Sequence, residues 1–490
     1  MRRAASASQR TNGVLIAGTS SDAGKSLVTT GLCRLLARRG VAVAPFKAQN
    51  MSNNSMVCAD GSEIGRAQYL QAQAAGVEAE SAMNPVLLKP GSDRQAFVVL
   101  RGRPSGTLMA GQYTAGRAEL AQAAFAAYEE LAARFDLIIS EGAGSPAEIN
   151  LRSGDYVNLG LARQFNLPVV VVGDIDRGGV FAALYGTVAL LEPADRALVR
   201  AFLINKFRGD EAVLRPGLDE LTARTGVPFA GVLPWLPDLW LDAEDTLEVA
   251  RWQHPGAVEH SLRVAVIRLP MMSNITDVDA IAAEPGVEVV LTADAAVIAT
   301  ADLAIVPGTR STVHDLTWLR QRGLDAALAS RAELRAPVLG LCGGYQMLAS
   351  AIEDPVESGC GGVAGLGMLP VTIHFSEGKV LGRPNGLWHG HEVQAYEIHH
   401  GVAHINGEAE AFLDGCRVGQ VWGTMWHGAL ENDDFRRAWL AEVAAASGST
   451  WLPQPDAPGF AGRREAMINQ LADAIEEHVD VELIVGGGHR

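Results

Sequence analysis

The stretch VLIAGTSSDAGKS, residues 14–26, decides the fold of the first half of this chain. An apolar, strand-like run ends at Gly18, a polar loop follows, and a helical apolar pattern then begins. Gly24, Lys25 and Ser26 supply N–H groups at a helix N-terminus, a lysine for the β- and γ-phosphates, and a hydroxyl for Mg²⁺. Five residues separate Gly18 from Gly24, one more than the strict phosphate-loop pattern has. The strand–loop–helix context still predicts phosphate binding.

Polar groups also follow three later strand-like runs. The run DLIIS leads into Glu141, a carboxylate of the kind that holds Mg²⁺. VVVVG leads into Asp174 and Asp176, and AFLI leads into Asn205, a candidate for base recognition. Each of these alone is also compatible with a solvated turn. Because ligands of open α/β sheets bind outside the carboxyl ends of the strands, the four strand ends together predict an ATP site.

Short β-rich runs alternate with helical patterns along the whole chain, which predicts two α/β domains with mainly parallel sheets flanked by helices. We expect a disordered leader over 1–11, a first domain over 12–250, a second over 258–450, and an extension with a packing helix over 451–490. The acidic, proline-punctuated stretch at 235–257 separates the domains. The predicted strands are Val14–Ala17, Val41–Pro45, Leu137–Ser140, Pro168–Gly173, Ala201–Asn205, a run from Leu262, Val287–Leu291, Leu303–Val306, Pro337–Leu341 and Val421–Met425.

Length and composition exclude several classes of protein. A chain of 490 residues exceeds one ordinary core, and 48% hydrophobic residues leave enough apolar surface to bury. A net charge of −16 argues against a general nucleic-acid binder or a protein of anionic membranes. The five cysteines form no CxxC pair and no metal-ligand spacing, which favours free thiols in a reducing cytoplasm. No apolar run is long enough to span a membrane.

The second half contains VLGLCGGYQML, residues 338–348, in which Cys342 follows a strand-like run. Gly343 and Gly344 permit a tight turn, and a helical pattern resumes at Tyr345. A side chain at such a turn is held above the sheet edge beside a helix N-terminus, as in a nucleophile elbow. A small buried core cysteine is the other interpretation of this stretch, and taken alone the stretch does not separate the two.

A cysteine nucleophile needs a base and a means of stabilising an oxyanion. His427 follows a strand-like run about 85 residues after Cys342, which makes it the candidate base. Gly308 sits in a tight loop after another predicted strand. Its N–H and that of Gly343 are candidates for holding a tetrahedral oxyanion.

These motifs resemble known families. GLCGGYQML, IVPGTRST and GTMWHG are similar to class I glutamine amidotransferases of the cobyric/cobyrinic acid synthase branch. GTSSDAGKS, EGAGSPAEINL, DIDRGG and NKFRGD follow the order of the dethiobiotin-synthetase-type ATPase fold. FKAQNMSNNS (46–55), LPMMSNITDVDA (269–280) and AYEIHHG (395–401) resemble the cobyric acid synthases in particular. The resemblance implies a P-loop NTPase-like domain followed by a flavodoxin-like glutaminase.

The resemblance also implies a reaction. Cys342, activated by His427, attacks the glutamine side-chain amide and releases ammonia. In the first domain, MgATP phosphorylates a carboxylate, and ammonia displaces the phosphate. The implied acceptor is a corrinoid acid, adenosylcobyrinic acid a,c-diamide, amidated at its b, d, e and g carboxylates in cobalamin biosynthesis.

Roles for individual residues follow from the same resemblance. It places ATP at Thr19, Gly24, Lys25, Ser26 and Asn205, and Mg²⁺ at Ser26 and Glu141. Lys47 and Asn53, with Asp174 and Asp176, are candidates for the acceptor site, although QNMSNNS is equally compatible with an ordinary polar loop.

One position departs from the glutaminase pattern. Class I glutaminases usually carry His-x-Glu, and here Ala429 stands at the Glu position. The carboxylates nearest in sequence are Glu431, Asp433 and Asp434. We expect Glu431, four residues beyond His427, not to reach the imidazole, which leaves the third member of the catalytic group open.

Two rival functions remain at this point. Cobyrinic acid a,c-diamide synthase performs the same chemistry on other carboxylates, and only family motifs such as KAQNMSNNS argue against it. A regulatory ATPase with an inactive glutaminase domain is the rival from another class. Such ATPases carry a second lysine where this chain has Ser20, and the acidic C-terminal segment is better explained as a packing helix than as a membrane anchor.

Overall fold

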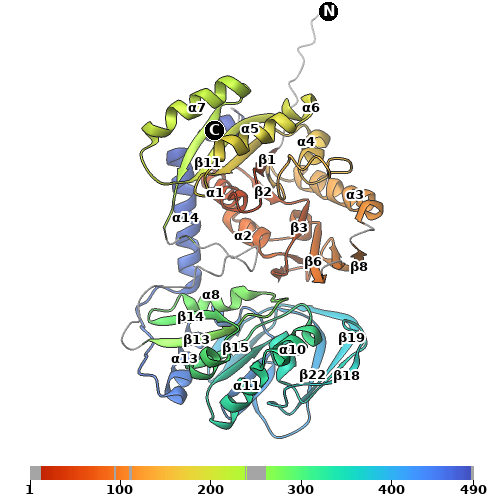
Figure 1. Cartoon of the computed structure of the whole chain (residues 1–490), viewed down its shortest axis with the longest axis vertical. Helices are drawn as coiled ribbons and strands as arrows, with labels where there is room; N and C mark the ends of the chain where they lie inside the picture. The colour runs from red at the N-terminus through yellow and green to blue at the C-terminus, as the bar shows by residue number, and fades with distance from the viewer. Residues whose placement is uncertain (1–12, 93–94, 110–112, 238, 240–260, 487–490) are drawn as a thin grey trace, which may run out of the picture.

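The computed structural model describes residues 13–92, 95–109, 113–237, 239 and 261–486. Two α/β domains lie one above the other, the first half of the chain forming the upper one in Figure 1 and the second half the lower one. The expected fold class is therefore confirmed. The expected leader at 1–11 and most of the segment expected to separate the domains lie outside the described residues.

The first domain is built on a parallel sheet of six strands in the order β12-β11-β10-β1-β9-β2. Its central strands are buried on both faces, which explains their continuous apolar sequences rather than an alternating pattern. The strands are β1 (Gly13–Gly18), β2 (Val43–Phe46), β9 (Leu137–Glu141), β10 (Val169–Asp174), β11 (Val199–Phe207) and β12 (Phe229–Pro234). Its helices are α1 (Lys25–Arg38), α2 (Arg66–Ala75), α3 (Tyr113–Ala132), α4 (Leu159–Phe165), α5 (Val180–Leu190), α6 (Pro193–Arg196) and α7 (Glu211–Thr225).

An insertion between β2 and α3, in which β3 pairs with β6 in parallel and the other strand pairs are antiparallel, was not predicted. It contains a sheet in the order β3-β6-β7-β8 and a small hairpin, β4-β5, which faces the second domain through contacts of β4 with β22. Its short strands carry many polar residues, so they lack a periodic apolar signal. They are β3 (Gln49–Met51), β4 (Ser55–Val57), β5 (Glu63–Gly65), β6 (Val86–Ser92), β7 (Gln95–Leu100) and β8 (Arg103–Met109).

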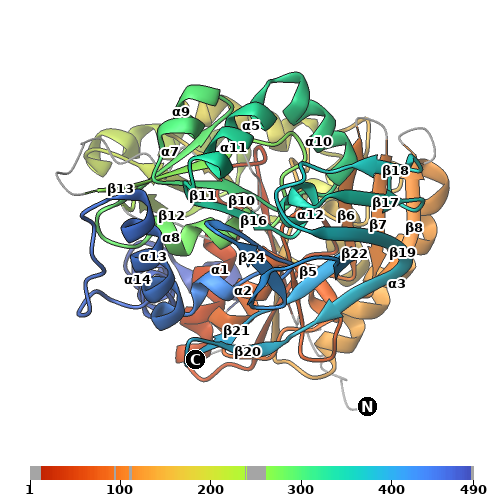
Figure 2. The same ribbon diagram turned by 90° about the horizontal axis from the view of Figure 1, so that it is seen from below.

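The second domain is built on a sheet in the order β14-β13-β15-β16-β25-β24-β23, parallel from β14 to β25 and antiparallel beyond. A second sheet, β18-β17-β19-β22, lies at the edge opposite α8, α13 and α14 (Figure 2). The strands are β13 (Leu262–Ile267), β14 (Val287–Thr292), β15 (Leu303–Val306), β16 (Val338–Leu341), β17 (Ala351–Asp354), β18 (Gly361–Ala364), β19 (Val371–Gly382), β22 (Glu397–Ile405), β23 (Glu410–Phe412), β24 (Gly415–Val418) and β25 (Val421–Thr424). The helices are α8 (Asp279–Ala282), α9 (Ala295–Thr300), α10 (Thr312–Gln321), α11 (Leu324–Glu333), α12 (Gly343–Leu348) and α13 (Asp433–Ser447).

The C-terminal extension returns to the first domain. Helix α14 (Phe460–His478) runs upward from the second domain and packs along α1 (Figure 1). Gly31 of α1 permits this close approach, since an added Cβ there would lie 2.5 Å from Ile475 Cδ1. The expected packing helix thus exists, and it covers a face of the nucleotide-binding sheet.

Every strand predicted from the sequence is present, with ends shifted by at most two residues. Among the described residues, no helix combines the length and the apolarity that a membrane span requires.

Candidate active sites

The phosphate loop joins β1 to α1, and its geometry follows from Gly24. Gly24 has φ 100°, a conformation that L side chains rarely adopt, and an added Cβ would lie 2.0 Å from Asn205 Nδ2. The Asn205 amide donates a hydrogen bond to the Ala23 carbonyl at 3.0 Å. Asn205, the predicted adenine ligand, therefore holds the loop in this structure.

A buried carboxylate lies beside the loop. Glu141, at the end of β9, is fully buried and accepts hydrogen bonds from Ser26 Oγ at 2.8 Å and Gln71 Nε2 at 2.6 Å, and it pairs with Lys47 Nζ at 2.9 Å. Burial alone raises the pKa of Glu141, but Lys47 and the hydrogen bonds outweigh it, so the pKa is lowered. Glu141 is therefore ionised near neutral pH, next to a serine hydroxyl.

This pair suits Mg²⁺, which is usually bound by one or two carboxylates together with substrate phosphates. The Ser26 hydroxyl and the Glu141 carboxylate are hydrogen-bonded to each other, so both reach a common position beside the loop. The described residues contain no cluster of three His, Cys, Asp or Glu side chains able to hold a metal ion alone. A cation here would therefore depend on the nucleotide for its other ligands.

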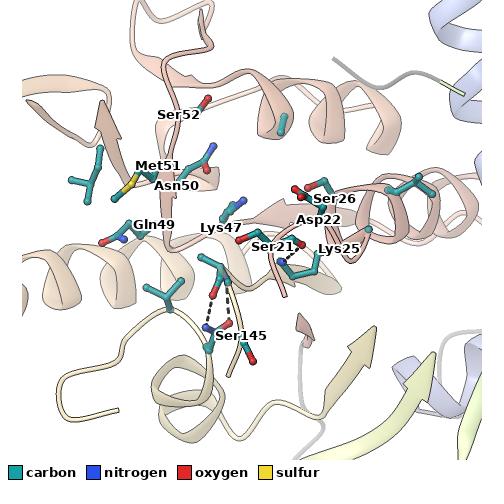
Figure 3. Close-up of a pocket in the computed structure, with 18 of the residues that line it drawn as sticks. Ser21, Asp22, Lys25, Ser26, Lys47, Gln49, Asn50, Met51, Ser52 and Ser145 are labelled. Carbon is teal, nitrogen blue, oxygen red and sulfur yellow. Dashed lines mark hydrogen bonds between the residues drawn. The ribbon is translucent and has the colours of Figure 1, made fainter. Parts of the chain in front are cut away.

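A cavity of about 1330 Å³ extends from the phosphate loop toward the second domain. Figure 3 shows Lys25 and Ser26 at one end and Gln49 to Ser52 at the other, with Lys47 between them. Its wall also includes Asn53 and, from the second domain, Met271. Since ordinary small-molecule pockets span roughly 300–1,000 Å³, this one has room for a nucleotide and a second large substrate.

Three predicted residues lie elsewhere than expected. Asp174 and Asp176, candidates for the acceptor site, are not among the described residues that line the cavity. Asp174 pairs with Lys206 Nζ at 2.8 Å, and Asp176 faces Arg208 at 3.4 Å. Thr19 does not line the cavity either, and its N–H donates to a carbonyl of β10.

The second site centres on Cys342, between β16 and α12. Its φ of 47° and ψ of −107° are strained for a non-glycine residue, and its N–H donates to Thr424 O at 2.8 Å. The next two residues must be glycine, because a Cβ on Gly343 would lie 2.6 Å from Thr309 Cγ2 and one on Gly344 would lie 1.9 Å from Val306 O. The backbone at Cys342 therefore has the strand–turn–helix form that an elbow requires.

His427 lies three residues beyond β25 and is buried. Its Nδ1 and Asp277 Oδ2 are 2.6 Å apart, and the other oxygen of Asp277 accepts the N–H of Gly428 at 2.7 Å. Burial lowers the pKa of His427, but the Asp277 carboxylate and the Cys342 thiolate outweigh burial and raise the pKa to about 10. With Nδ1 directed at Asp277, Nε2 is the nitrogen left for Cys342.

Asp277 was not identified from the sequence, although its segment, LPMMSNITDVDA, was. It lies on a short 3₁₀ turn, Ile275–Val278, 150 residues before His427, whereas the pattern of class I glutaminases places the third residue just after the histidine. The expectation for Glu431 agrees with the structure: its two oxygens bond Arg66 Nη2 at 2.5 Å and Arg464 Nη1 at 2.9 Å. Asp433 accepts a hydrogen bond from the N–H of Phe460.

The two candidate oxyanion donors lie in the same corner of the second domain. A Cβ on Gly308 would lie 3.1 Å from His427 Cε1, and Gly343 packs against Thr309, the residue that follows Gly308. The N–H of Ser273 donates to Gly308 O at 2.9 Å and fixes this loop. The structure thus brings Cys342, His427 and both glycines together.

Comparison with known proteins gives the class of this two-site chain. Residues 14–249 match the CobQ/CobB/MinD/ParA nucleotide binding domain, and residues 263–435 match the CobB/CobQ-like glutamine amidotransferase domain. A nucleotide-binding domain joined to a glutaminase domain defines a glutamine-dependent amidoligase.

Curated relatives extend over nearly the whole chain. Cobyric acid synthase of Cutibacterium acnes (strain DSM 16379 / KPA171202) is 63% identical over 96% of this chain and 99% of its own length. The cobyric acid synthases of Streptomyces coelicolor (57%) and Mycolicibacterium gilvum (55%) each cover 96% of this chain, and 95% and 96% of their own lengths. The chain belongs to the cobyric acid synthase family. The enzyme class expected from the motifs, a glutamine-hydrolysing amidoligase of cobalamin biosynthesis, is thereby confirmed.

Proposed function

We propose that this enzyme converts adenosylcobyrinic acid a,c-diamide to adenosylcobyric acid by amidating its b, d, e and g carboxylates, with glutamine as nitrogen donor and ATP as activator. The observation that carries the proposal is the wall of the large cavity. It reaches from Lys25 of the phosphate loop to Met271, six residues before the aspartate that bonds the candidate base of the glutaminase. One cavity thus connects the place where a carboxylate is activated with the domain that supplies ammonia.

In the glutaminase half, the raised pKa of His427 keeps the imidazole protonated near neutral pH, facing Cys342. A thiolate paired with this imidazolium attacks the side-chain carbonyl of glutamine, and the C–N bond breaks as His427 gives its proton to the leaving nitrogen. N–H groups of Gly308 and Gly343 stabilise the tetrahedral oxyanion. His427 then takes a proton from water, which attacks the thioester and releases glutamate. Asp277 holds the imidazole in orientation through both steps.

In the synthetase half, Lys25 and the N–H groups of the loop stabilise the phosphates of ATP. Ser26 and Glu141 would hold Mg²⁺, and its positive charge would be supplied beside the phosphates. Lys25 now bonds the carbonyls of Ser20 and Ser21, at 2.8 and 3.3 Å, and would exchange these for phosphate oxygens. A corrinoid carboxylate near Lys47 and Asn53 attacks the γ-phosphate, and ADP leaves as the acyl phosphate forms. Ammonia then attacks the acyl carbon, inorganic phosphate leaves, and loss of a proton from nitrogen gives the amide.

The test is a glutamine-dependent ATPase assay with mass spectrometry of the corrinoid product. Adenosylcobyrinic acid a,c-diamide should gain four amide nitrogens, with about one ATP consumed per amide. If cobyrinic acid itself is instead amidated at a and c, the chain is the a,c-diamide synthase. Absence of ATP consumption with either corrinoid would reject both assignments.

A further inference from the structure

The group that orients the catalytic histidine is held from the other domain. Asp277 belongs to a five-residue segment, residues 273–277, that connects three places. Its first residue donates to the candidate oxyanion loop at Gly308 O, and its last bonds His427. Between them, Asn274 and Ile275 are bonded by residues of the nucleotide-binding domain.

The contact across the domains is reciprocal and buried. The N–H of Ser55 donates to Asn274 Oδ1 at 2.9 Å, and the N–H of Ile275 donates to Asn54 Oδ1 at 3.3 Å. Asn54 is 2% exposed and Asn274 is 4% exposed, so neither bond is exchanged readily for water.

Asn274 adopts a left-handed backbone conformation at the start of the turn. Its φ and ψ of 49° and 41° lie in the left-handed region, which asparagine tolerates better than other non-glycine residues. Its carbonyl accepts the N–H of Asp277 at 3.2 Å and so begins the turn that carries the aspartate. A shift of the Asn274 side chain is therefore transmitted to Asp277 through one turn of backbone.

On the first-domain side, the partner residue belongs to the wall of the acceptor cavity. Asn54 lines that cavity together with Lys47 and Asn53. Its own N–H is held by Ser52 Oγ at 3.0 Å, and its carbonyl accepts the N–H of Arg66 at 3.1 Å. Through Asn54, the turn that carries Asp277 is thus connected both to the cavity wall and to the start of α2.

From this geometry we infer that Asn54 and Asn274 are positioning residues for the glutaminase: the nucleotide-binding domain places Asp277 against His427, so glutamine hydrolysis depends on how the two domains are joined. The inference rests on the proposed role of Asp277. It adds that Asn54, a residue of the first domain outside the cysteine site, affects the rate of glutamine hydrolysis.

The test uses the full chain and compares Asn54→Ala, Asn274→Gly and Asp277→Asn. Glycine at 274 accommodates the left-handed backbone and removes only the side-chain acceptor, so it separates the hydrogen bond from strain. Glu431→Gln is the matched control, because it removes another contact between the domains, that with Arg66, without touching Asn274.

Both asparagine variants should lower kcat for glutamine hydrolysis about 5- to 10-fold, the size of an ordinary coupling between packed sites. They should also move the alkaline limb of the pH profile to lower pH, as Asp277→Asn does, because a displaced Asp277 no longer raises the pKa of His427. In the Asp277→Asn background, Asn54→Ala should cost less than about twofold more, since both act through one group. Glu431→Gln should leave the limb in place.

An unshifted alkaline limb in both asparagine variants, or losses that simply multiply with that of Asp277→Asn, would overturn the inference. The proposed role of Asp277 fails differently: Asp277→Asn would then hydrolyse glutamine like the unmodified chain, with the same pH profile, whatever the asparagine variants do. The proposed function is tested separately, by the corrinoid product.

Discussion

In the phosphate site, most functional groups stand near the end of a strand, on the loop that follows or in the first turn of the next helix, and these strands belong to one sheet. In the cysteine site, the groups come from loops after three strands and from a separate turn that the other domain holds in place. The first arrangement depends on local backbone and on the order of parallel strands. The second depends on packing between segments up to 150 residues apart. The comparison predicts that a change at the domain contact disturbs glutamine hydrolysis more than it disturbs the phosphate loop.

The largest effect is expected for Cys342→Ala. Glutamine-dependent amidation should fall by roughly 10⁵-fold or more, as when a covalent nucleophile is removed from an enzyme. Amidation with added ammonia should persist, because that route does not use the thioester. Both rates are measured on one preparation, and equal loss of both would contradict the separation of the two sites.

His427→Ala should lower glutamine hydrolysis by about 10²- to 10⁴-fold, the usual contribution of a general base or acid. Steady-state glutaminase assays measure the loss, and ammonia-dependent synthesis serves as the folding control. Near-normal hydrolysis in this variant would remove the histidine from the proposed mechanism.

Lys25→Ala tests the other half of the comparison. Amidation should fall by roughly 10²- to 10³-fold with glutamine and with ammonia alike, since a charge that stabilises the phosphates is lost from the step both routes share. Glutamine hydrolysis measured without a corrinoid should stay within a few-fold of normal. Undiminished ammonia-dependent synthesis would show that this loop does not bind the reacting ATP.

Asp277→Asn should lower glutamine hydrolysis at pH 7.5 by about 10- to 100-fold, because a thiol nucleophile depends less than a serine on the orientation of its base. The pH profile carries the sharper result. Against the effect of burial, Asp277 and Cys342 together raise the pKa of His427 to about 10, so the imidazolium persists in the unmodified chain until the pH approaches that value. Without the carboxylate that pKa falls, and the alkaline limb of kcat/KM should move toward neutral pH. An unchanged limb would mean that Asp277 does not govern the charge of His427.

The smallest effect is expected for Glu431→Gln. Glutamine hydrolysis should change by less than about threefold, because the carboxylate bonds two arginines rather than the imidazole and a Gln side chain keeps hydrogen-bonding capacity toward them. A loss as large as that of His427→Ala would make Glu431 part of the catalytic group and contradict the assignment of Asp277.

The candidate sites could be predicted from the sequence wherever a short run specifies its own backbone. Gly24 and the glycines after Cys342 signal their turns directly, and Glu141 follows an apolar strand of recognisable length. Asp174 and Asp176 show the limit of this reasoning: they do stand at a strand end, but they pair with Lys206 and Arg208 and lie off the cavity. A position at the end of a strand predicts that a residue lies at the edge of the sheet, but it does not predict the direction in which the side chain points.

By itself, the sequence determined two parallel α/β domains, a phosphate loop and a cysteine elbow, because strand period, glycine turns and helix starts are encoded within about a dozen residues. Only the tertiary structure decided that Asp277 completes the cysteine site and that α14 packs against α1. Neither contact has a local signal, since each joins residues that meet only after the sheets have formed. The hydrogen bonds that join Asn54 and Ser55 to residues 275 and 274 also lack a local signal. They form because two polar turns are buried against each other between the domains, where each satisfies hydrogen-bonding groups of the other.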